Sequence, residues 1–271
     1  MQIKFYGVRG SIPTPGVDTQ GYGGNTPCVL LTSQSGQQLI LDAGTGIRLL
    51  GQELATGREE LVLLLSHNHW DHIQGFPFFA PAYQPGRQIR IIPGKTLNAE
   101  HDAILRQMSG EFFPVAPEQL PSRVLITPQD ADQWHLGDFF IQRCCLNHPG
   151  SGSAYRISAD GQAMAYVTDN ELFPPQQEFT SRAQWLDFVA GVDVLIHDGQ
   201  YLDADMPYKL GWGHSLVSQA VALAQDAKVK KLVIFSHDPA RTDQQLDQLA
   251  QDLSHQQPEI VMAKEGVELW C

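Results

Sequence analysis

Three histidines and one aspartate fall within six consecutive positions of this 271-residue sequence. They are His67, His69, Asp71 and His72, in the segment SHNHWDHIQG, directly after the apolar run 61–65. Imidazole nitrogens and carboxylate oxygens are ligands that suit Zn, Mn and Fe. Side chains that project beyond the end of a buried strand can converge on one point. We therefore interpret this segment as half of a metal site, in preference to an ordinary polar loop.

Three later apolar runs with the character of strands also end in a histidine or an aspartate. They lead to His148, Asp169 and His237. One such strand would be unremarkable, but four in one chain predict a ligand cluster at one rim of a sheet. Asp42 ends another predicted strand, before a glycine-rich turn, and we expect it to brace the metal loop and not to bind the metal.

The elements that would position these residues alternate between strands and helices in each half of the chain. Strands are predicted at 3–8, 28–33, 38–42, 61–65, 89–92, 139–146, 153–158, 162–169, 193–198, 231–237 and 260–271. Helices are predicted at 98–109 and 182–190, from about His214–Ser215 onward, and at 242–256. Two sheets packed face to face, with helices outside, would satisfy this order. The expected fold is an α/β four-layer αββα sandwich forming a single domain, 1–271.

Charge and composition narrow the class of substrate. The formal net charge is −12 and the 18 basic residues form no dense cluster, whereas a long nucleic-acid footprint needs many Lys and Arg contacts to phosphates. No apolar run approaches eighteen residues, so no membrane span is expected. A small-molecule substrate is therefore favoured over nucleic acid.

The cysteines and the N-terminus bear on the compartment. Cys28, Cys144, Cys145 and Cys271 show no C-x-x-C spacing, and the adjacent pair suggests a strand instead of a disulfide framework. The opening MQIKFYGVRG reads as a strand and not as a signal peptide. A reduced cytoplasm fits these features best.

Several motifs together resemble the metallo-β-lactamase superfamily. They are SHNHWDHIQG, the later His148, Asp169 and His237, and the GTG turn after Asp42. That fold is an αββα sandwich with a binuclear metal site at its edge. The segment GWGHS is similar to the His-Ser-Thr motif of ribonuclease Z and related phosphodiesterases, with Leu216 in place of Thr. GVRGSIP, YGGNTPCV and FFPV resemble a bacterial group of cyclic-nucleotide-phosphodiesterase-like hydrolases.

The resemblance implies seven ligands that are divided between two divalent metal ions, with Zn expected first and Mn or Fe as alternatives. One ion would be held by His67, His69 and His148, the other by Asp71, His72 and His237, and Asp169 would bridge them.

A two-metal centre would explain why no Ser or Cys nucleophile is needed. Such metals, roughly 3.5–4 Å apart, share a hydroxide and lower the pKa of water from about 15.7 to about 7. The hydroxide would attack phosphorus in line, and the leaving alkoxide would need a proton. His214 is the candidate acid, oriented by Asp198 of IHDGQY, although it could instead be a polar residue at a helix start that Ser215 caps. The predicted catalytic residues are His214, Asp198 and Asp71, and His197 is expected to support the site indirectly.

The preferred function is hydrolysis of a small phosphodiester such as a cyclic nucleotide. The runner-up is tRNA 3′ processing of the ribonuclease Z type, which typically uses a long flexible arm; only residues 170–213 lie between Asp169 and His214. Hydrolysis of a lactam, lactone or thioester is a further alternative, against which GWGHS counts. A non-enzymatic metal-binding protein is the last. Related enzymes are often dimers, but no segment identifies a homodimer interface.

Two loops are expected to influence the choice of substrate. The Gly- and Pro-rich loop around Gly24 could be either a hairpin excursion or a wall of the active site. The aromatic side chains of Phe112 and Phe113 are expected in the core more readily than on a ligand platform.

Overall fold

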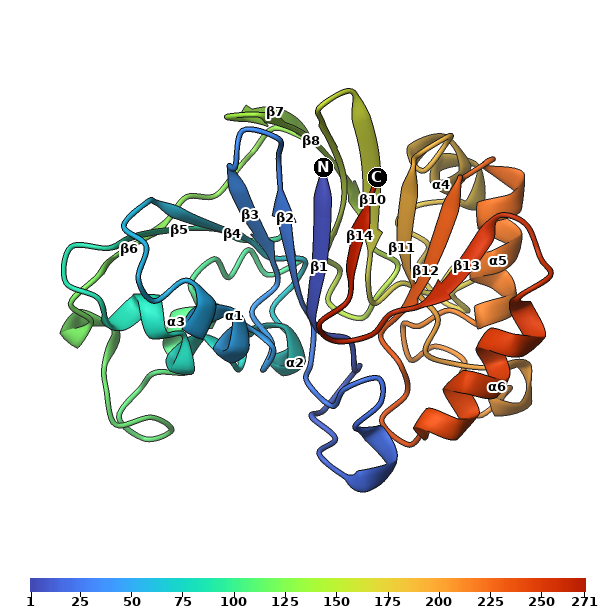
Figure 1. Ribbon diagram of the computed structural model, residues 1–271, viewed down its shortest axis with the longest axis horizontal. Coiled ribbons are helices and arrows are strands. Elements are labelled where there is room, and N and C mark those ends of the chain that lie inside the picture. The colour runs from blue at the N-terminus through green and yellow to red at the C-terminus, as the bar shows by residue number, and fades with distance from the viewer.

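The computed structural model describes all residues 1–271, and its centre is a pair of seven-stranded sheets that pack face to face (Figure 1). The strand order of the first sheet is β14-β1-β2-β3-β4-β5-β6, and that of the second is β13-β12-β11-β10-β9-β8-β7. The strands of the first sheet are β1 (Gln2–Gly7), β2 (Cys28–Thr32), β3 (Gln38–Leu41), β4 (Leu61–Leu64), β5 (Gln88–Ile92), β6 (Arg123–Ile126) and β14 (Glu268–Trp270). Those of the second are β7 (Gln133–Leu136), β8 (Phe139–Cys145), β9 (Ser153–Ala159), β10 (Gln162–Val167), β11 (Val194–Asp198), β12 (Lys231–Phe235) and β13 (Glu259–Met262).

Helices cover the outer face of each sheet (Figure 1). The first sheet is covered by α1 (Ile47–Glu53), α2 (Trp70–Ile73) and α3 (Ala103–Arg106) with the 3₁₀ turns η2 (Phe76–Phe78), η3 (Ala80–Tyr83) and η4 (Pro117–Gln119). The second is covered by α4 (Arg182–Phe188), α5 (Val217–Asp226) and α6 (Asp243–Leu253). Two further 3₁₀ turns, η1 (Val17–Thr19) and η5 (Asp203–Asp205), lie in loops. No helix combines the length and the apolar character that crossing a membrane requires.

The apolar runs of the sequence are explained by burial on both faces of each sheet. In β4, Val62 and Leu64 enter the core between the sheets, whereas Leu61 and Leu63 pack under the helices of the first sheet. This alternation follows from the period of two along a strand, and a strand buried on both faces reads as a continuous apolar run. The predicted αββα sandwich is confirmed.

The topology brings the ends of several strands to one rim. β3, β4 and β5 run parallel in the first sheet, and β10, β11, β12 and β13 run parallel in the second. β8 has the same direction as β10, because both pair antiparallel with β9. A short parallel bridge between Arg9 and His237 joins the loop after β1 to the end of β12. The segments that follow β4, β8, β10, β11 and β12 therefore meet at one edge of the sandwich.

The structure differs from the sequence prediction in a few elements. β6 and β7 were not expected, and of the predicted helix 98–109 only the single turn α3 forms. The helix expected near His214 begins at Val217 with Leu216 at its N-cap, so Ser215 is not the cap. The last strand, β14, leaves the second sheet and pairs with β1, which places the two termini beside each other (Figure 1).

Candidate metal centre

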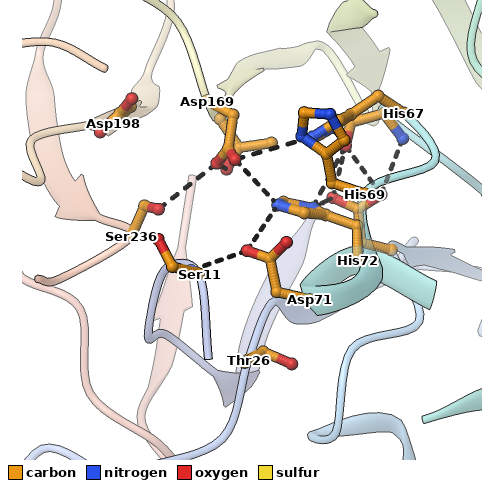
Figure 2. Close-up of polar contacts among 12 residues, drawn as sticks. Ser11, Thr26, His67, His69, Asp71, His72, Asp169, Asp198 and Ser236 are labelled. Carbon is orange, nitrogen blue, oxygen red and sulfur yellow. Dashed lines mark hydrogen bonds and ion pairs between the residues drawn. The ribbon is translucent and has the colours of Figure 1, made fainter. Parts of the chain in front are cut away.

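Six of the seven predicted ligands meet at this rim of the sandwich. Figure 2 shows His67, His69, Asp71, His72 and Asp169 of this group. His67 and His69 lie in the loop after β4, and Asp71 and His72 lie in the short helix α2 that continues it. His148 follows β8, and Asp169 follows β10. The first sheet thus supplies four of these residues and the second sheet supplies two.

The carboxylate of Asp169 lies at the centre of the cluster. Its Oδ2 atom is 3.2 Å from Nε2 of His72, 3.7 Å from Nε2 of His67 and 3.9 Å from Nε2 of His148. Asp71 Oδ2 lies 3.3 Å from the same His72 nitrogen. Asp169 therefore belongs to two groups of potential ligands, His67–His69–His148 on one side and Asp71–His72 on the other. This arrangement suits a carboxylate that bridges two cations.

The chemistry of the donor atoms fits divalent metal ions. The Nε2 atoms of His67 and His72 are buried and have no hydrogen-bond partner. Buried polar atoms are rarely left without a partner unless a ligand or ion satisfies them. Nδ1 of His69 lies 2.9 Å from Nε2 of His148, and two such nitrogens can share either a proton or a cation. Divalent metal binding by this cluster is consistent with its nitrogen and oxygen donors.

Hydrogen bonds on the far side of the rings fix their orientation. Nδ1 of His72 donates to Asp42 Oδ2 at 2.8 Å, and Nδ1 of His148 donates to the carbonyl of Gly213 at 2.8 Å. Asp42 also accepts from the backbone N–H of Ser66 at 2.7 Å and from the hydroxyl of Tyr166 at 2.8 Å. The prediction that Asp42 braces the metal loop is confirmed. Partners of this kind hold the Nε2 atoms toward the metal.

Left-handed backbone conformations occur at the strand ends that form the site. Asp42, Asp169 and Ser236 follow β3, β10 and β12 with φ angles of 58°, 48° and 58°, and Ser11 has φ 65°. Residues with a Cβ adopt such angles rarely, and they occur preferentially at functional sites. At Asp42, Asp169 and Ser236 this conformation redirects the chain just after a strand.

Charges within the cluster move the pKa values in opposite directions. Burial lowers the pKa of His67 well below 6.5 and that of His148 to about 4. Burial also opposes protonation of His72, but Asp71, Asp169 and Asp42 outweigh this effect and raise the pKa of His72 well above 6.5. Although burial raises the pKa of Asp169, His72 and the other nearby histidines hold it well below 3.8. At neutral pH the site therefore combines the neutral rings of His67 and His148 with a charged His72 ring and an ionised Asp169 carboxylate.

The predicted acid and its partner form a buried pair beside the cluster. Nδ1 of His214 lies 2.9 Å from Asp198 Oδ2, and a ring nitrogen of His214 lies within 4.8 Å of an Asp169 carboxylate oxygen. Burial disfavours the charged ring, but Asp198 first and then Asp169 raise the pKa of His214 to about 9. Asp198 is fixed in turn by the backbone N–H groups of Asn170 and Gln200. A protonated imidazole at neutral pH can act as a general acid.

The structure does not bring His237 to the cluster. The ring is buried, and its Nε2 atom donates to the carbonyl of Ala263 at 2.8 Å. Its neighbour Ser236 faces the cluster instead, with Oγ 3.4 Å from Asp169 Oδ1 (Figure 2). The interpretation of His237 as a ligand therefore requires correction, because the turn at Ser236 directs the following side chain away. The motif FSHDP offered no signal for which of its two residues would face inward.

Of the remaining residues singled out in the sequence, one is buried in a strand and the others lie in loops. His197 is buried in β11, where its Nδ1 atom donates to the carbonyl of Asp198 and the ring makes no hydrogen bond to a ligand side chain. The loop after β1 does form a wall of the site, because the N–H of Ser11 donates to Asp71 Oδ2 at 2.8 Å. Phe112 is 71% exposed, whereas Phe113 is partly buried against the core under the first sheet.

Known proteins share both the sequence pattern and the architecture. Residues 37–237 match a family described as "Beta-lactamase superfamily domain". Among curated relatives, the ribonuclease Z of Bradyrhizobium sp. (strain ORS 278) is 23% identical over 86% of this chain and 88% of its own. The ribonuclease Z of Halalkalibacterium halodurans is 21% identical over 92% of this chain and 91% of its own.

Two solved structures have the same fold over nearly their whole length. The metallo-beta-lactamase fold protein YhfI from Bacillus subtilis superposes with a TM-score of 0.71 at 18% identity, covering 99% of both chains. A structure titled as a new diphosphatase from the PhnP family superposes with a TM-score of 0.70 at 17% identity, covering 100% of this chain and 97% of that one. With its family match, its fold and its histidine–aspartate cluster, the chain belongs to the beta-lactamase superfamily and has the metallo-β-lactamase fold.

Proposed function

We propose that this protein is a binuclear metal-dependent phosphodiesterase that hydrolyses small phosphodiesters such as cyclic nucleotides. The observation that supports this most directly is the hydrogen-bonded pair of His214 and Asp198. The two side chains lie beside the ligand cluster, with polar atoms within 4.8 Å of an Asp169 carboxylate oxygen. A metal site alone would suit hydrolysis of many bonds, whereas a protonated imidazole next to it suits reactions that expel an alkoxide.

Each residue has a defined task in this proposal. The metal ions, when bound, supply a hydroxide at neutral pH and stabilise the charge of the phosphoryl oxygens. His67, His69 and His148 would hold one ion, Asp71 and His72 would belong to the other, and Asp169 would bridge them. As the bond between phosphorus and the ester oxygen breaks, His214 gives its proton to that oxygen. Asp198 keeps the ring oriented and charged until the transfer.

An aromatic groove beside the cluster supports a substrate with a base or another flat group. Trp70 stands between His69 and Asp71 in the sequence and is 71% exposed. With Phe78, Phe112 and Phe113 it lines a groove of about 550 Å³. Aromatic faces of this kind stack on nucleobases whatever their identity. Arg106 is the cation in the lining of the same groove.

The alternative that a specific observation favours is a ribonuclease Z activity, because the curated relatives described above carry that name. Against it, the segment 170–213 contains α4 and β11 and so leaves little chain for a long arm. The net charge of −12 also disfavours binding of a long polyanion. We therefore rank the small diester above the tRNA precursor.

Two measurements test the proposal. Elemental analysis of the purified protein should find about two metal ions per chain, and the protein reconstituted with Zn²⁺ or Mn²⁺ should hydrolyse bis(p-nitrophenyl) phosphate. Absence of both metal and activity after reconstitution would refute it. Efficient 3′ trimming of a tRNA precursor, with no turnover of cyclic nucleotides, would reverse the ranking of substrates.

A further inference from the structure

The two halves of the ligand cluster offer different sets of donor atoms to a metal ion. On one side three histidines, His67, His69 and His148, lie with Asp169 so that one ligand atom from each falls within 4.8 Å of the others. On the other side only Asp71 and His72 share Asp169 in this way. The first set thus has three nitrogens and one oxygen, whereas the second has one nitrogen and two oxygens.

At the end of β12, the residue that faces the cluster is Ser236, which offers a hydroxyl oxygen, and not His237, which would have offered an imidazole nitrogen. Ser236 faces Asp169 (Figure 2), and its hydroxyl lies 3.4 Å from Asp169 Oδ1 and 3.3 Å from the side-chain oxygen of Gln200. The imidazole of the next residue, His237, is committed to the carbonyl of Ala263. The additional polar atoms on this side of the cluster are therefore hydroxyl and amide oxygens.

Neighbouring contacts hold these oxygens in place. The amide nitrogen of Gln200 donates to the hydroxyl of Ser11 at 3.2 Å, which leaves its oxygen directed toward Ser236. Gly10 leaves the space for both groups, because a Cβ atom there would lie 2.1 Å from the Gln200 oxygen and 2.6 Å from the Ser236 hydroxyl. The close approach of this backbone explains why glycine is required at position 10.

We infer that the two metal sites, His67–His69–His148 and Asp71–His72, differ in affinity and in metal preference. This inference rests on the proposed two-metal function. Imidazole-rich sets favour Zn²⁺, whereas carboxylate, hydroxyl, carbonyl and water oxygens suit Mn²⁺. The His67–His69–His148 site holds zinc tightly. The Asp71–His72 site, flanked by Ser236 and Gln200, binds its cation more weakly and discriminates less between zinc and manganese.

Stepwise reconstitution of the metal-free full-length protein tests this inference. One equivalent of Zn²⁺ is added and then excess Mn²⁺, with elemental analysis for zinc and electron paramagnetic resonance for bound manganese. We expect one zinc ion to survive dialysis while manganese binds reversibly, with an affinity at least about 100-fold weaker than that of the zinc. Two zinc ions retained with equal affinity would overturn the inequality but leave the proposed function intact. A protein that binds no metal would refute both.

Variants at Ser236 and at its neighbour locate the difference. Ser236→His adds an imidazole nitrogen beside the Asp71–His72 site and should raise the affinity for a second zinc ion about tenfold or more. Histidine tolerates the left-handed conformation at this position better than most residues. Ser236→Ala, which removes only the hydroxyl, should weaken manganese binding several-fold and leave the tight zinc site unchanged. His237→Gln is the matched control and should leave the metal stoichiometry unchanged. Loss of a metal ion from His237→Gln, or unchanged manganese affinity in Ser236→Ala, would contradict the assignment.

Discussion

Nδ1 of His214 lies 2.9 Å from Asp198 Oδ2, and both side chains are buried at the edge of the metal cluster. In the proposed mechanism, this pair links the ligand cluster to one class of reaction, in which an alkoxide leaves. A buried carboxylate favours the protonated ring, and the protonated ring is what an alkoxide leaving group requires. The pair therefore predicts how the enzyme responds to the leaving group and to pH.

The leaving-group dependence is tested with His214→Ala. Turnover of a cyclic nucleotide should fall about 10²- to 10⁴-fold, because the alkoxide no longer receives a proton. Turnover of bis(p-nitrophenyl) phosphate should fall far less, since p-nitrophenolate leaves without protonation. The exposed His255→Ala serves as a control for both substrates. Equal losses on the two substrates, or loss of bound metal from the variant, would show that His214 is not the acid.

Asp198→Asn addresses the pH dependence. Burial opposes the charged His214 ring, but Asp198 is the largest of the effects that raise its pKa to about 9. Removal of that carboxylate lowers the pKa of His214, so the active protonated form is lost at a lower pH. The alkaline limb of kcat should move down by about one pH unit or more. A profile identical to that of the unmodified enzyme would argue against the role of Asp198.

The brace beneath His72 predicts an effect on metal affinity. Asp42→Asn weakens the bond that orients the His72 ring and should lower metal affinity about 10- to 100-fold, as for other partners of metal-binding histidines. Competition with a chromophoric chelator measures this. Tyr166→Phe removes one hydrogen bond to Asp42 and should have a smaller effect. If both variants bind metal as the unmodified protein does, Asp42 does not orient the ring.

The buried ring of His237 makes a separate prediction about stability. Burial lowers the pKa of His237 from 6.5 to about 4, so the unfolded chain takes up a proton first as the pH falls. The contribution of the neutral His237 ring to the free energy of unfolding is therefore fully present above about pH 6.5. It decreases by about 3 kcal/mol as the pH falls toward 4.

Urea unfolding of the metal-free proteins measures this effect. Between pH 6.5 and pH 4, the free energy of unfolding of His237→Gln should fall by about 3 kcal/mol less than that of the unmodified chain. Glutamine retains an N–H donor for Ala263 and lacks the titrating ring. The comparison cancels the carboxylates, because both chains contain the same ones. Parallel pH profiles for the two proteins would contradict the assignment of a neutral, buried His237.

The sequence predicted the sandwich and most of the cluster because both rest on short-range signals. Apolar runs such as 61–65 identify strands buried on both faces, and the dense spacing from His67 to His72 identifies ligands within one loop. His148 and Asp169 were recognisable because each follows a strand that ends at the same rim. The identity of Asp198 as the partner of His214 followed from the resemblance of two separate motifs.

What the sequence could not show depends on the backbone at single residues. Whether Ser236 or His237 faces the metals is decided by a left-handed turn at Ser236, and no local pattern specifies that angle. The contact from the N–H of Ser11 to Asp71 depends likewise on how a long loop folds back. The aromatic groove combines Trp70 with Phe112, which are separated by a stretch of chain whose path the periodicity does not determine.

³¹P nuclear magnetic resonance can follow the proposed metal-dependent hydrolysis of a small phosphodiester without a coupled assay. A 2′,3′-cyclic nucleotide is incubated with the metal-reconstituted protein and, in parallel, with the chelated protein. We predict that the cyclic diester signal is replaced by that of a nucleoside monophosphate only in the reconstituted sample. An unchanged diester signal with the fully metal-loaded protein, for every cyclic nucleotide tested, would show that the protein is not a phosphodiesterase for these substrates.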